Sequence, residues 1–551
     1  MNDQRRVLLA FVLMAVVLAF SQWWYSRLTP PEETPPAEEA PAEAAAPPPP
    51  PIQAQAPPTP PAPPMAIDNE LLAGQPPPTS VTIETPLYRA VIDPQGGAMK
   101  AIELSRYPSF TGPGPVQLVP GAASFLRRAA DLGTDRLALS DYRFAVSDTL
   151  IQLAAGDPPG DLTLRYRSGE RTLTQTYRFD PSRYVIDYEL DFGSRANGVL
   201  VTSLGPRLES NEKNRRDDYG QLRAVARVDG EVVSRQAKEV DEGEALALAG
   251  DVDWAGIRNK YFLAVLMAAS ETEPLSGATM GGDANDSLPR VDVAVGAPIR
   301  GGRASYRLYM GPQEYQRLSR LNEGLDDVNQ YGWSWIRWMI TPFAKLCVRI
   351  MLWLHQFIPS YGLVLMVFAL LVRVITWPLT TKSYRSIRAM QKLQPELQRI
   401  KEQYKADPQK MQQATMGLYK EKKVNPLGGC LPNMIPMPIL FALFFVFQAT
   451  IEFRGQPFLW LGDLSQPDPL YILPVFMGAT IYASSKMTTT DPKMAAMTYV
   501  MPIVLTFVFL NLAAGLVLYY ALSNLLTFVQ QWWLKHSMGH MDGGAAEAVA
   551  G

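Results

Sequence analysis

Long apolar stretches are concentrated near the two ends of the chain. The first covers residues 7–20, and the other five follow residue 360. These five are residues 361–378, 428–450, 470–485, 494–512 and 515–533. A helix needs about 20 apolar residues to cross the hydrocarbon core of a bilayer. The pattern therefore predicts a polytopic α-helical membrane protein with six transmembrane helices, of which residues 428–533 form the third to the sixth.

The first apolar stretch is short enough for a cleaved signal peptide, which is the alternative to a membrane anchor. It follows Arg5 and Arg6 and leads directly into Trp23, Trp24 and Tyr25. Aromatic residues of this kind gather at the level of the lipid headgroups. Because the stretch ends in such residues and not in a small-residue cleavage site, we expect residues 1–28 to remain as an N-terminal transmembrane anchor.

Between the apolar ends, the polar and apolar residues alternate. Leu162, Leu164 and Tyr166 alternate with polar residues, and a second alternating run covers residues 184–192. Alternation with a period of two is typical of half-buried β-strands. Together with frequent turns rich in glycine and proline, it predicts a large exported all-β sandwich domain over residues 80–330.

Two segments that flank this domain differ from it in composition. Residues 29–79 are dominated by Pro, Ala and Glu, and 16 of the 48 prolines lie within residues 30–64. Such a composition cannot bury a core and predicts an extended linker. Residues 331–360 mix tryptophan and aliphatic residues with basic residues such as Arg337 and Lys345. They predict an amphipathic helix that lies in the membrane interface.

The distribution of charge predicts the orientation in the membrane. The net charge is only −2, but residues 381–427 hold eleven Lys or Arg and four Asp or Glu, a local charge of +7 that leaves −9 for the rest. Lys and Arg favour cytoplasmic loops. We therefore expect a basic cytoplasmic helical hairpin over residues 379–427, a cytoplasmic tail over residues 534–551, and export of residues from about 26 to 340. Both termini are then cytoplasmic. The candidate contact residues of the hairpin are Lys382, Arg385, Arg388 and Lys392.

Few residues in the sequence support catalysis or metal binding. The chain has two cysteines and three histidines, none of the histidines precedes His355, and no G-x-x-x-x-G-K-[ST] motif occurs. These facts exclude a disulfide-stapled scaffold, a zinc ribbon, a histidine-based triad in the exported part and a P-loop. We expect no catalytic residue, no cofactor and no metal ion. The alternative for the exported domain is an anchored sugar-processing enzyme that uses Asp251 and Asp253.

An arginine lies inside the second predicted span. Arg373 precedes Pro378 by five residues, and no Asp or Glu occurs in any of the six apolar stretches. An arginine at the centre of a span costs about 2.5 to 3.5 kcal/mol on insertion scales. Two explanations remain open, namely snorkelling of the side chain to the cytoplasmic headgroups and a water-filled cavity open to that side.

Polar residues on other spans favour the cavity. Tyr520, Ser523, Asn524 and Thr527 are spaced at i, i+3, i+4 and i+7, which places them on one face of the last predicted helix. Gln448 in the third span adds hydrogen-bonding capacity. The alternative is that such residues only hold helices together. A transporter of a small anion that uses the arginine would require internal repeats and coupling carboxylates, and the spans contain neither.

With these residues assembled, the chain resembles the YidC/Oxa/Alb family of membrane protein insertases in its long Gram-negative form. The resemblance covers about residues 361–531. It rests on Arg373 with Trp377-Pro378-Leu379-Thr380, Lys423-Val424-Asn425-Pro426-Leu427-Gly428-Gly429-Cys430, Tyr471-Ile472-Leu473-Pro474, and Gly515-Leu516-Val517-Leu518-Tyr519-Tyr520 with Ser523-Asn524. The exported domain is similar in position and size to the periplasmic β-super-sandwich of the family.

The resemblance implies a function and a site. A polypeptide under insertion would enter a hydrophilic groove open to cytoplasm and lipid, without nucleotide hydrolysis, and leave along the second and last spans. Arg373 matches the groove arginine, Tyr520 matches a substrate-contacting tyrosine beside Tyr519, and the basic hairpin matches a region that receives substrate. Ala369 stands where some members carry a polar residue.

The resemblance also implies partners and a location. The expected partners are nascent and newly made membrane proteins, the Sec translocon, ribosome-nascent chain complexes and membrane lipids, with no nucleic acid directly implied. The expected location is the bacterial inner membrane, with the large domain in the periplasm.

Overall fold

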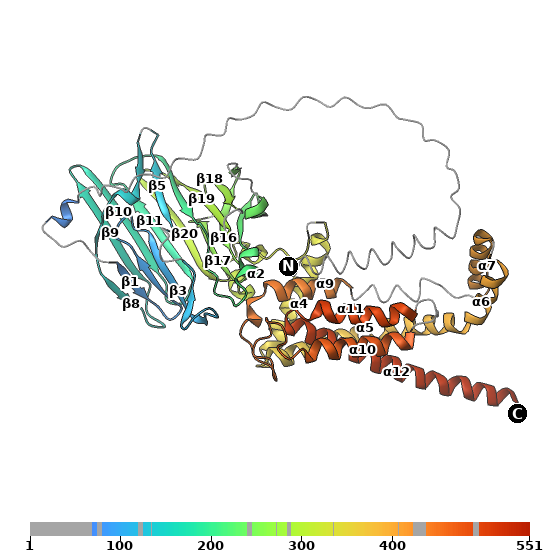
Figure 1. Cartoon of the computed structure of the whole chain (residues 1–551). Coiled ribbons are helices and arrows are strands. Elements are labelled where there is room, and N and C mark those ends of the chain that lie inside the picture. Colours follow the sequence, from blue (N-terminus) through green and yellow to red (C-terminus); the bar gives the residue numbers. More distant parts are fainter. Residues whose placement is uncertain are drawn as a thin grey trace, which may run out of the picture. The chain divides into compact units, whose positions relative to one another are not determined.

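The described residues fold as two compact units, one within residues 46–328 and the other within residues 329–551 (Figure 1). We call them the β-domain and the helical unit. The computed structural model describes residues 69–73, 80–119, 125–133, 135–239, 245–270, 273–283, 288–333, 335–405, 407–422, 437–488 and 495–550. The predicted anchor, residues 1–28, and most of the predicted linker, residues 29–79, lie outside these residues.

The described strands of the β-domain form three sheets, and all neighbours pair antiparallel except β1 and β8. The five-stranded sheet has the order β4 (Pro115–Gln117), β3 (Met99–Pro108), β2 (Tyr88–Ile92), β1 (Val81–Glu84) and β8 (Leu150–Gln152). The nine-stranded sheet has the order β14 (Glu231–Gln236), β13 (Arg223–Val228), β16 (Val252–Arg258), β17 (Phe262–Ala268), β20 (Arg303–Pro312), β11 (Val185–Asp191), β10 (Arg171–Phe179), β9 (Gly160–Ser168) and β7 (Ala145–Val146). The six-stranded sheet has the order β15 (Leu246–Leu248), β18 (Gly277–Asp283), β19 (Arg290–Ile299), β12 (Gly198–Leu204), β5 (Arg127–Asp131) and β6 (Arg136–Ala138).

Short helices complete the β-domain. They are η1 (Glu70–Leu72), η2 (Leu139–Asp141), α2 (Arg215–Gly220), η3 (Ala237–Glu239), α3 (Tyr315–Arg320) and η4 (Leu325–Asp327).

The core of the β-domain lies between the nine-stranded and the six-stranded sheets, which pack through β16, β19 and β20 (Figure 1). The predicted alternation is confirmed, because Leu162, Leu164 and Tyr166 of β9 are all buried. Strand β17 is buried along its whole length, so both faces of the large sheet are covered there. Tyr107 of β3 packs against Phe262 of β17, which joins the five-stranded sheet to the same core.

An arginine is buried among tyrosines in this core. Arg128 of β5 places its guanidinium carbon 4.1 Å from the ring centre of Tyr188 and 5.3 Å from that of Tyr177. Its Nε donates to the Tyr306 hydroxyl at 2.6 Å, and its Nη1 donates to the Gly97 carbonyl at 3.0 Å. Burial raises the pKa of Tyr177 and Tyr188 well above that of a free phenol, so both hydroxyls stay neutral. The charge is therefore stabilised by hydrogen bonds and aromatic faces.

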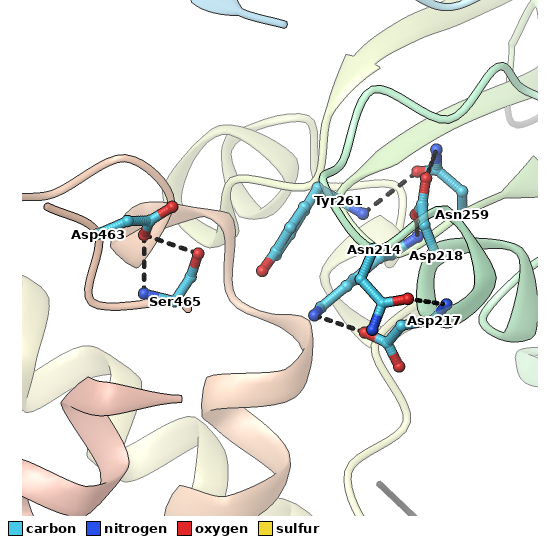
Figure 2. Close-up of polar contacts among 8 residues, drawn as sticks. Asn214, Asp217, Asp218, Asn259, Tyr261, Asp463 and Ser465 are labelled. Atoms are coloured by element: carbon cyan, nitrogen blue, oxygen red, sulfur yellow. Dashed lines mark hydrogen bonds and ion pairs between the residues drawn. The ribbon is translucent and has the colours of Figure 1, made fainter. Parts of the chain in front are cut away.

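A second buried polar cluster surrounds helix α2 (Figure 2). Asn214 caps the helix, because its side chain accepts from the backbone N–H of Asp217 at 3.1 Å. The Nζ of Lys260 pairs with Asp217 at 2.9 Å, and its backbone N–H donates to Asp218 at 3.1 Å. Asp218 is almost fully buried. Burial, reinforced by the charge of nearby Glu212, raises the pKa of Asp218 to about 6.

This shift predicts a pH dependence of stability that Asp218→Asn removes. The pKa of Asp218 is about 6 in the folded state, compared with an ordinary value of 3.8, so the folded state binds the proton more tightly. Its contribution to the free energy of unfolding therefore falls as the pH rises from about 4 to about 6, by up to about 3 kcal/mol. Thermal unfolding of the full chain at several pH values measures this contribution as the difference between parent and variant. A difference that stays constant from pH 4 to pH 7 would contradict the assignment.

The helical unit is formed by helices and short connections. Its described elements are α4 (Arg337–His355), α5 (Tyr361–Lys392), α6 (Gln394–Gln403), α7 (Pro408–Glu421), α9 (Met437–Ala449), η6 (Ile451–Phe453), α10 (Ile472–Thr488), α11 (Ala495–Phe509) and α12 (Ala514–Ala550). Helix α4 falls within the predicted amphipathic segment. It buries Ile340, Val348 and Met351 on one side and exposes Trp338 and Trp353 on the other.

Helix α5 begins at the predicted residue but continues for 14 residues beyond Pro378 to Lys392. Proline lacks the N–H that would bond the carbonyl four residues earlier, here that of Val374, yet helices of membrane proteins tolerate proline. Here the hydroxyls of Thr376, Thr380 and Thr381 donate to carbonyls one turn earlier, at 2.9 to 3.1 Å. The predicted hairpin of residues 379–427 therefore begins as the end of α5 and continues as α6 and α7.

Six transmembrane helices remain a prediction. Among the described residues, α5 is the helix that is long and apolar enough to cross a membrane, while Met437–Ala449 and Tyr499–Phe509 are shorter apolar helices. The predicted spans at 470–485 and 515–533 coincide with α10 and the first half of α12. The first predicted span, and residues 428–436 of the third, lie outside the described residues.

Candidate functional site

A polar cavity of about 340 Å³ lies inside the helical unit. Helices α5 and α12 supply most of its wall, and α9 and α10 supply the rest. The lining residues that carry the site are Arg373, Thr376, Thr380, Tyr519, Tyr520, Ser523, Asn524, Thr527, Gln530 and Gln531. None of the described residues that line it is acidic. The cavity therefore combines one permanent positive charge with neutral hydroxyl and amide groups.

Gln530 of α12 holds the arginine in place. The Nη2 of Arg373 donates to the Gln530 Oε1, which also accepts from the Thr380 hydroxyl at 3.1 Å. The Gln530 Nε2 donates to the Thr381 hydroxyl at 3.1 Å and to the Trp377 carbonyl at 3.3 Å. Gln530 is almost fully buried, so this network fixes the guanidinium on the α12 side of the cavity.

The partner of Arg373 is neutral, and this decides the electrostatics of the site. A carboxylate at this place would cancel the positive charge, whereas an amide orients the guanidinium and leaves the charge in force. The Nε of Arg373 is buried and has no hydrogen-bond partner within the described part of the chain. The cavity thus contains a cation whose hydrogen bond to Gln530 does not neutralise its charge.

The predicted stripe of α12 lies along the cavity, but its members have different environments. The Tyr520 hydroxyl donates to the Leu440 carbonyl of α9 at 2.8 Å, so this group joins two helices. The Thr527 hydroxyl donates to the Ser523 carbonyl at 2.7 Å, within its own helix. Ser523 and Asn524 are half-buried. The stripe therefore serves both helix packing and the cavity surface.

Tight packing holds α12 against its neighbours. A Cβ added at Gly515 would lie 2.4 Å from the ring of Phe447 in α9. Likewise, a Cβ added at Gly478 of α10 would lie 2.1 Å from the Thr506 hydroxyl of α11. Small residues allow helices to approach closely in membrane bundles. The close approach at Gly515 holds the start of α12 against α9, about one turn before Tyr519 and Tyr520.

The connection between α9 and α10 fixes where α10 and α12 begin. Asp468 is almost fully buried and accepts from the backbone N–H of Leu473 at 2.8 Å and from the Trp460 ring N–H at 3.1 Å. The Gln466 carbonyl accepts from the backbone N–H of Ala514, the first residue of α12, at 2.7 Å. The connection therefore satisfies N–H groups that the starts of helices leave unpaired. Within it, Asp463 accepts from Ser465 (Figure 2).

The structure brings most, but not all, of the predicted groove residues together. Arg373, Tyr519, Tyr520, Ser523, Asn524 and Thr527 line one cavity. Gln448 does not line it. It follows Leu440 by eight residues on α9, which is about 12 Å along the helix axis. Its Nε2 is buried without a hydrogen-bond partner among the described residues. Ala369, the departure from the family pattern, does line the cavity.

The predicted hairpin residues lie on the last turns of α5. Lys382 and Arg385 are exposed, whereas Arg388 is half-buried and donates to the Lys535 carbonyl of α12 at 3.3 Å. Lys392 ends the helix. Helices α6 and α7 then pack on each other through a small apolar cluster. Its buried members are Leu393, Leu397 and Leu418.

Sequence reasoning missed Gln530, which is the central residue of the network. A signal was present, because Gln530 and Gln531 follow Thr527 at i+3 and i+4 and continue the same helical face. The predicted stripe stopped one turn too early. Thr376 and Thr380 carried the same signal on α5, at i+3 and i+7 from Arg373.

The carboxylates of the alternative enzyme hypothesis do not form a site. Asp253 pairs with Arg227 at 3.4 Å, and Asp251 is exposed. Among the described residues, no group of three His, Cys, Asp or Glu side chains is placed to hold a metal ion.

Two family profiles together match most of the chain. The profile of the YidC periplasmic domain matches residues 80–346, and that of the 60Kd inner membrane protein matches residues 353–541. The membrane protein insertase YidC of Syntrophus aciditrophicus is 31% identical over 475 residues, which cover 83% of this chain and 84% of that protein. This chain belongs to the YidC family.

Other YidC proteins give the same result. The membrane protein insertase YidC of Oleidesulfovibrio alaskensis is 33% identical over 472 residues, which cover 82% of this chain and 86% of that protein. Among solved structures, the chain is similar to an active YidC insertase with its first transmembrane domain resolved, at 19% identity and a TM-score of 0.35, covering 82% of this chain and 92% of that one. YidC family proteins are inner membrane proteins with a periplasmic domain, so this chain contains a periplasmic β-rich domain and a helical C-terminal region.

Proposed function

We propose that this chain is a membrane protein insertase of the bacterial inner membrane, in which the polar cavity receives the hydrophilic part of a polypeptide that is to be translocated. The observation that carries the proposal is a cavity lined by one charged and several polar side chains, inside helices whose outer residues are apolar. Arg373, Ser523 and Asn524 lie at the cavity, whereas Val374 and Ile375 of the same α5 turn are more than 60% exposed. Apolar exposed side chains of this kind suit contact with lipid.

The cavity reduces the cost of moving a polar segment across the bilayer. Each unsatisfied polar group in hydrocarbon costs several kcal/mol, and a polypeptide tail carries two such groups per residue in its backbone alone. Hydroxyl and amide groups such as those of Ser523, Asn524 and Thr376 can exchange hydrogen bonds with water or with the tail. The tail then loses its hydration over only part of the membrane thickness.

The charge of Arg373 gives the cavity a preference for acidic tails. Gln530 fixes the guanidinium without neutralising it, so an Asp or Glu of the substrate finds an unpaired cation in a medium of low effective dielectric. This interaction lowers the energy of the intermediate in which the tail occupies the cavity. A neutral tail gains only hydrogen bonds.

The driving force comes from the substrate, and no nucleotide is needed. Each methylene of a substrate span that moves from water into the bilayer contributes roughly 0.8 kcal/mol. A span of about 20 apolar residues therefore outweighs the cost of a short translocated tail. The insertase lowers the barrier between the two states and leaves their difference unchanged.

The remaining regions fit this scheme in a topology with six spans and both termini in the cytoplasm. The basic surface of α5, α6 and α7 would receive the substrate, with Lys382, Arg385, Arg388 and Lys392 facing nascent chains on ribosomes or the Sec translocon. Clusters of Lys and Arg beside a membrane helix also attract anionic lipids. The β-domain would lie in the periplasm.

Reconstitution tests the proposed function. Vesicles that contain the purified full chain should insert a small membrane protein with a single span, as measured by protection of its translocated tail from added protease. We expect insertion without nucleotide, at a rate well above that of protein-free vesicles. An absolute requirement for ATP, or equal rates with and without the chain, would contradict the proposal.

Labelling of introduced cysteines tests the cavity separately. In a variant in which Cys347 and Cys430 are replaced by serine, Ser523→Cys should react with a membrane-impermeant thiol reagent added from the cytoplasmic side. Phe507→Cys on the exposed face of α11 serves as the lipid-facing control and should stay unlabelled. Equal labelling of the two positions would remove the basis for a hydrated cavity.

A further inference from the structure

A second cavity, of about 450 Å³, lies beside the first one. It is bounded by α5, α10 and α12, and Tyr384 of α5 belongs to the walls of both cavities. Ligand sites in proteins occupy roughly 300 to 1,000 Å³, so this space is large enough for a small polar group. Its lining residues are Tyr384, Arg388, Gln391, Tyr482, Ala483, Lys486, Met487, Phe528 and Lys535.

Three cations from three different helices converge on this cavity. Arg388 comes from α5, Lys486 from α10 and Lys535 from α12, and none of the described lining residues is acidic. Like charges repel, so their convergence costs free energy unless an anion lies between them. In the described part of the chain, none of the three forms an ion pair, although ion pairs are frequent elsewhere in it, for example between Lys422 and Glu396.

The geometry of Arg388 orients its guanidinium for binding. One of its N–H groups donates to the Lys535 carbonyl at 3.3 Å, which joins α5 to α12. A guanidinium has five N–H donors in a planar fork that matches the oxygens of a phosphate. The contact with α12 uses one donor and leaves the other N–H groups of the guanidinium available for a ligand.

The cavity also has an apolar lining. Phe528, Met487 and Ala483 belong to its wall, on the same two helices as Lys486 and Lys535. On the same stretch of α12, Val529, Trp532 and Trp533 are about half exposed, as expected of side chains in contact with lipid. A ligand that suits both the cations and the apolar lining has an anionic head and an apolar body. Inorganic phosphate and an acidic peptide lack the apolar body.

We propose that this cavity, which we call the basic pocket, binds the phosphate headgroup of an anionic phospholipid at the mouth of the polar cavity. Basic pockets between membrane helices on the cytoplasmic side are suited to anionic headgroups. The lipid phosphate joins α5, α10 and α12, and its acyl chains lie along the exposed face of α12. The inference goes beyond the insertase function, because it concerns a lipid held by the protein itself.

Native mass spectrometry of the purified full chain in detergent tests this site. We expect phosphatidylglycerol to remain bound and phosphatidylcholine to dissociate. The triple variant Arg388→Gln, Lys486→Gln, Lys535→Gln should bind phosphatidylglycerol about a hundredfold more weakly, since each cation near an anionic headgroup contributes about fivefold. Lys486→Gln alone should give a smaller loss in the same direction, and it leaves the contact between Arg388 and Lys535 intact.

The control variant removes the same number of positive charges, one arginine and two lysines, from the neighbouring hairpin. Arg399→Gln, Lys405→Gln, Lys420→Gln changes three exposed residues of α6, α7 and their connection, and should retain phosphatidylglycerol like the parent. Equal loss in both triple variants would overturn the proposal, because the effect would then reflect net charge. Displacement of the lipid by an equal concentration of inorganic phosphate or of an acidic peptide would overturn it as well. Because the measurement is of lipid binding, its failure leaves the insertase function untouched.

Discussion

Replacement of Arg373 by alanine is expected to slow the insertion of a substrate with an acidic translocated tail roughly tenfold, which corresponds to a loss of about 1.4 kcal/mol at the barrier. The reason is that Arg373 is the charged group among the described residues of the polar cavity. A substrate that differs only in having neutral amides in its tail should be slowed about twofold or less. Both rates are measured by protease protection in vesicles that contain the full chain.

A variant of the neighbouring residue separates charge from structure. Gln530→Glu places a carboxylate on the Nη2 of Arg373 and keeps the guanidinium in place. If the charge attracts the tail, this variant should lose the preference for acidic substrates as Arg373→Ala does, while Arg373→Lys retains most of it. Equal slowing of acidic and neutral substrates by both variants would show that the network has only a structural role.

Replacement of Arg128 by alanine is expected to destabilise the β-domain by about 3 to 5 kcal/mol. The truncation leaves a cavity between the two large sheets and removes the aromatic contacts with Tyr177, Tyr188 and Tyr306. Hydrogen–deuterium exchange of the full chain measures the effect. Peptides from β10, β11 and β20 should lose protection by about a hundredfold or more, whereas peptides from α12 should not change.

Arg128→Met separates packing from charge. Methionine fills most of the space and removes the cost of burying a charge. The two groups that lose their hydrogen bond to Arg128 keep other partners. The Gly97 carbonyl still accepts from the Tyr177 hydroxyl at 2.5 Å, and the Tyr306 hydroxyl still lies 3.4 Å from the Thr202 hydroxyl. We therefore expect a loss of less than about 2 kcal/mol. A loss as large as that of alanine would show that the guanidinium itself holds the sheets together.

The periodicity of apolar residues predicted those helices and strands that have one buried face and one exposed face. The alternation around Leu164 predicted β9, and the apolar run from Tyr361 predicted the start of α5 to the residue. The spacing of Tyr520 and Ser523 predicted a face of α12 that does line a cavity. Such features can be predicted from the sequence because a period of two or 3.6 follows directly from backbone geometry.

Long-range partners could not be predicted in the same way. The contact between Arg373 and Gln530 joins residues 157 positions apart, and the burial of Arg128 depends on three strands that follow it in the chain. The division of the strands into three sheets has the same origin, since it depends on pairings such as β11 with β20. The sequence predicts that a span ends at Pro378, whereas α5 continues to Lys392, because a proline in a long helix can bend it without ending it.

The uninterrupted course of α5 has a mechanical consequence. Arg373 and Lys392 lie on one helix, about 28 Å apart along its axis. A force applied to the basic end of α5 is transmitted to the arginine as a tilt or a bend of this helix. Pro378 lies between the two and is the point at which bending requires the least work. A bend at Pro378 would therefore change the angle between the basic end of α5 and the turn that carries Arg373.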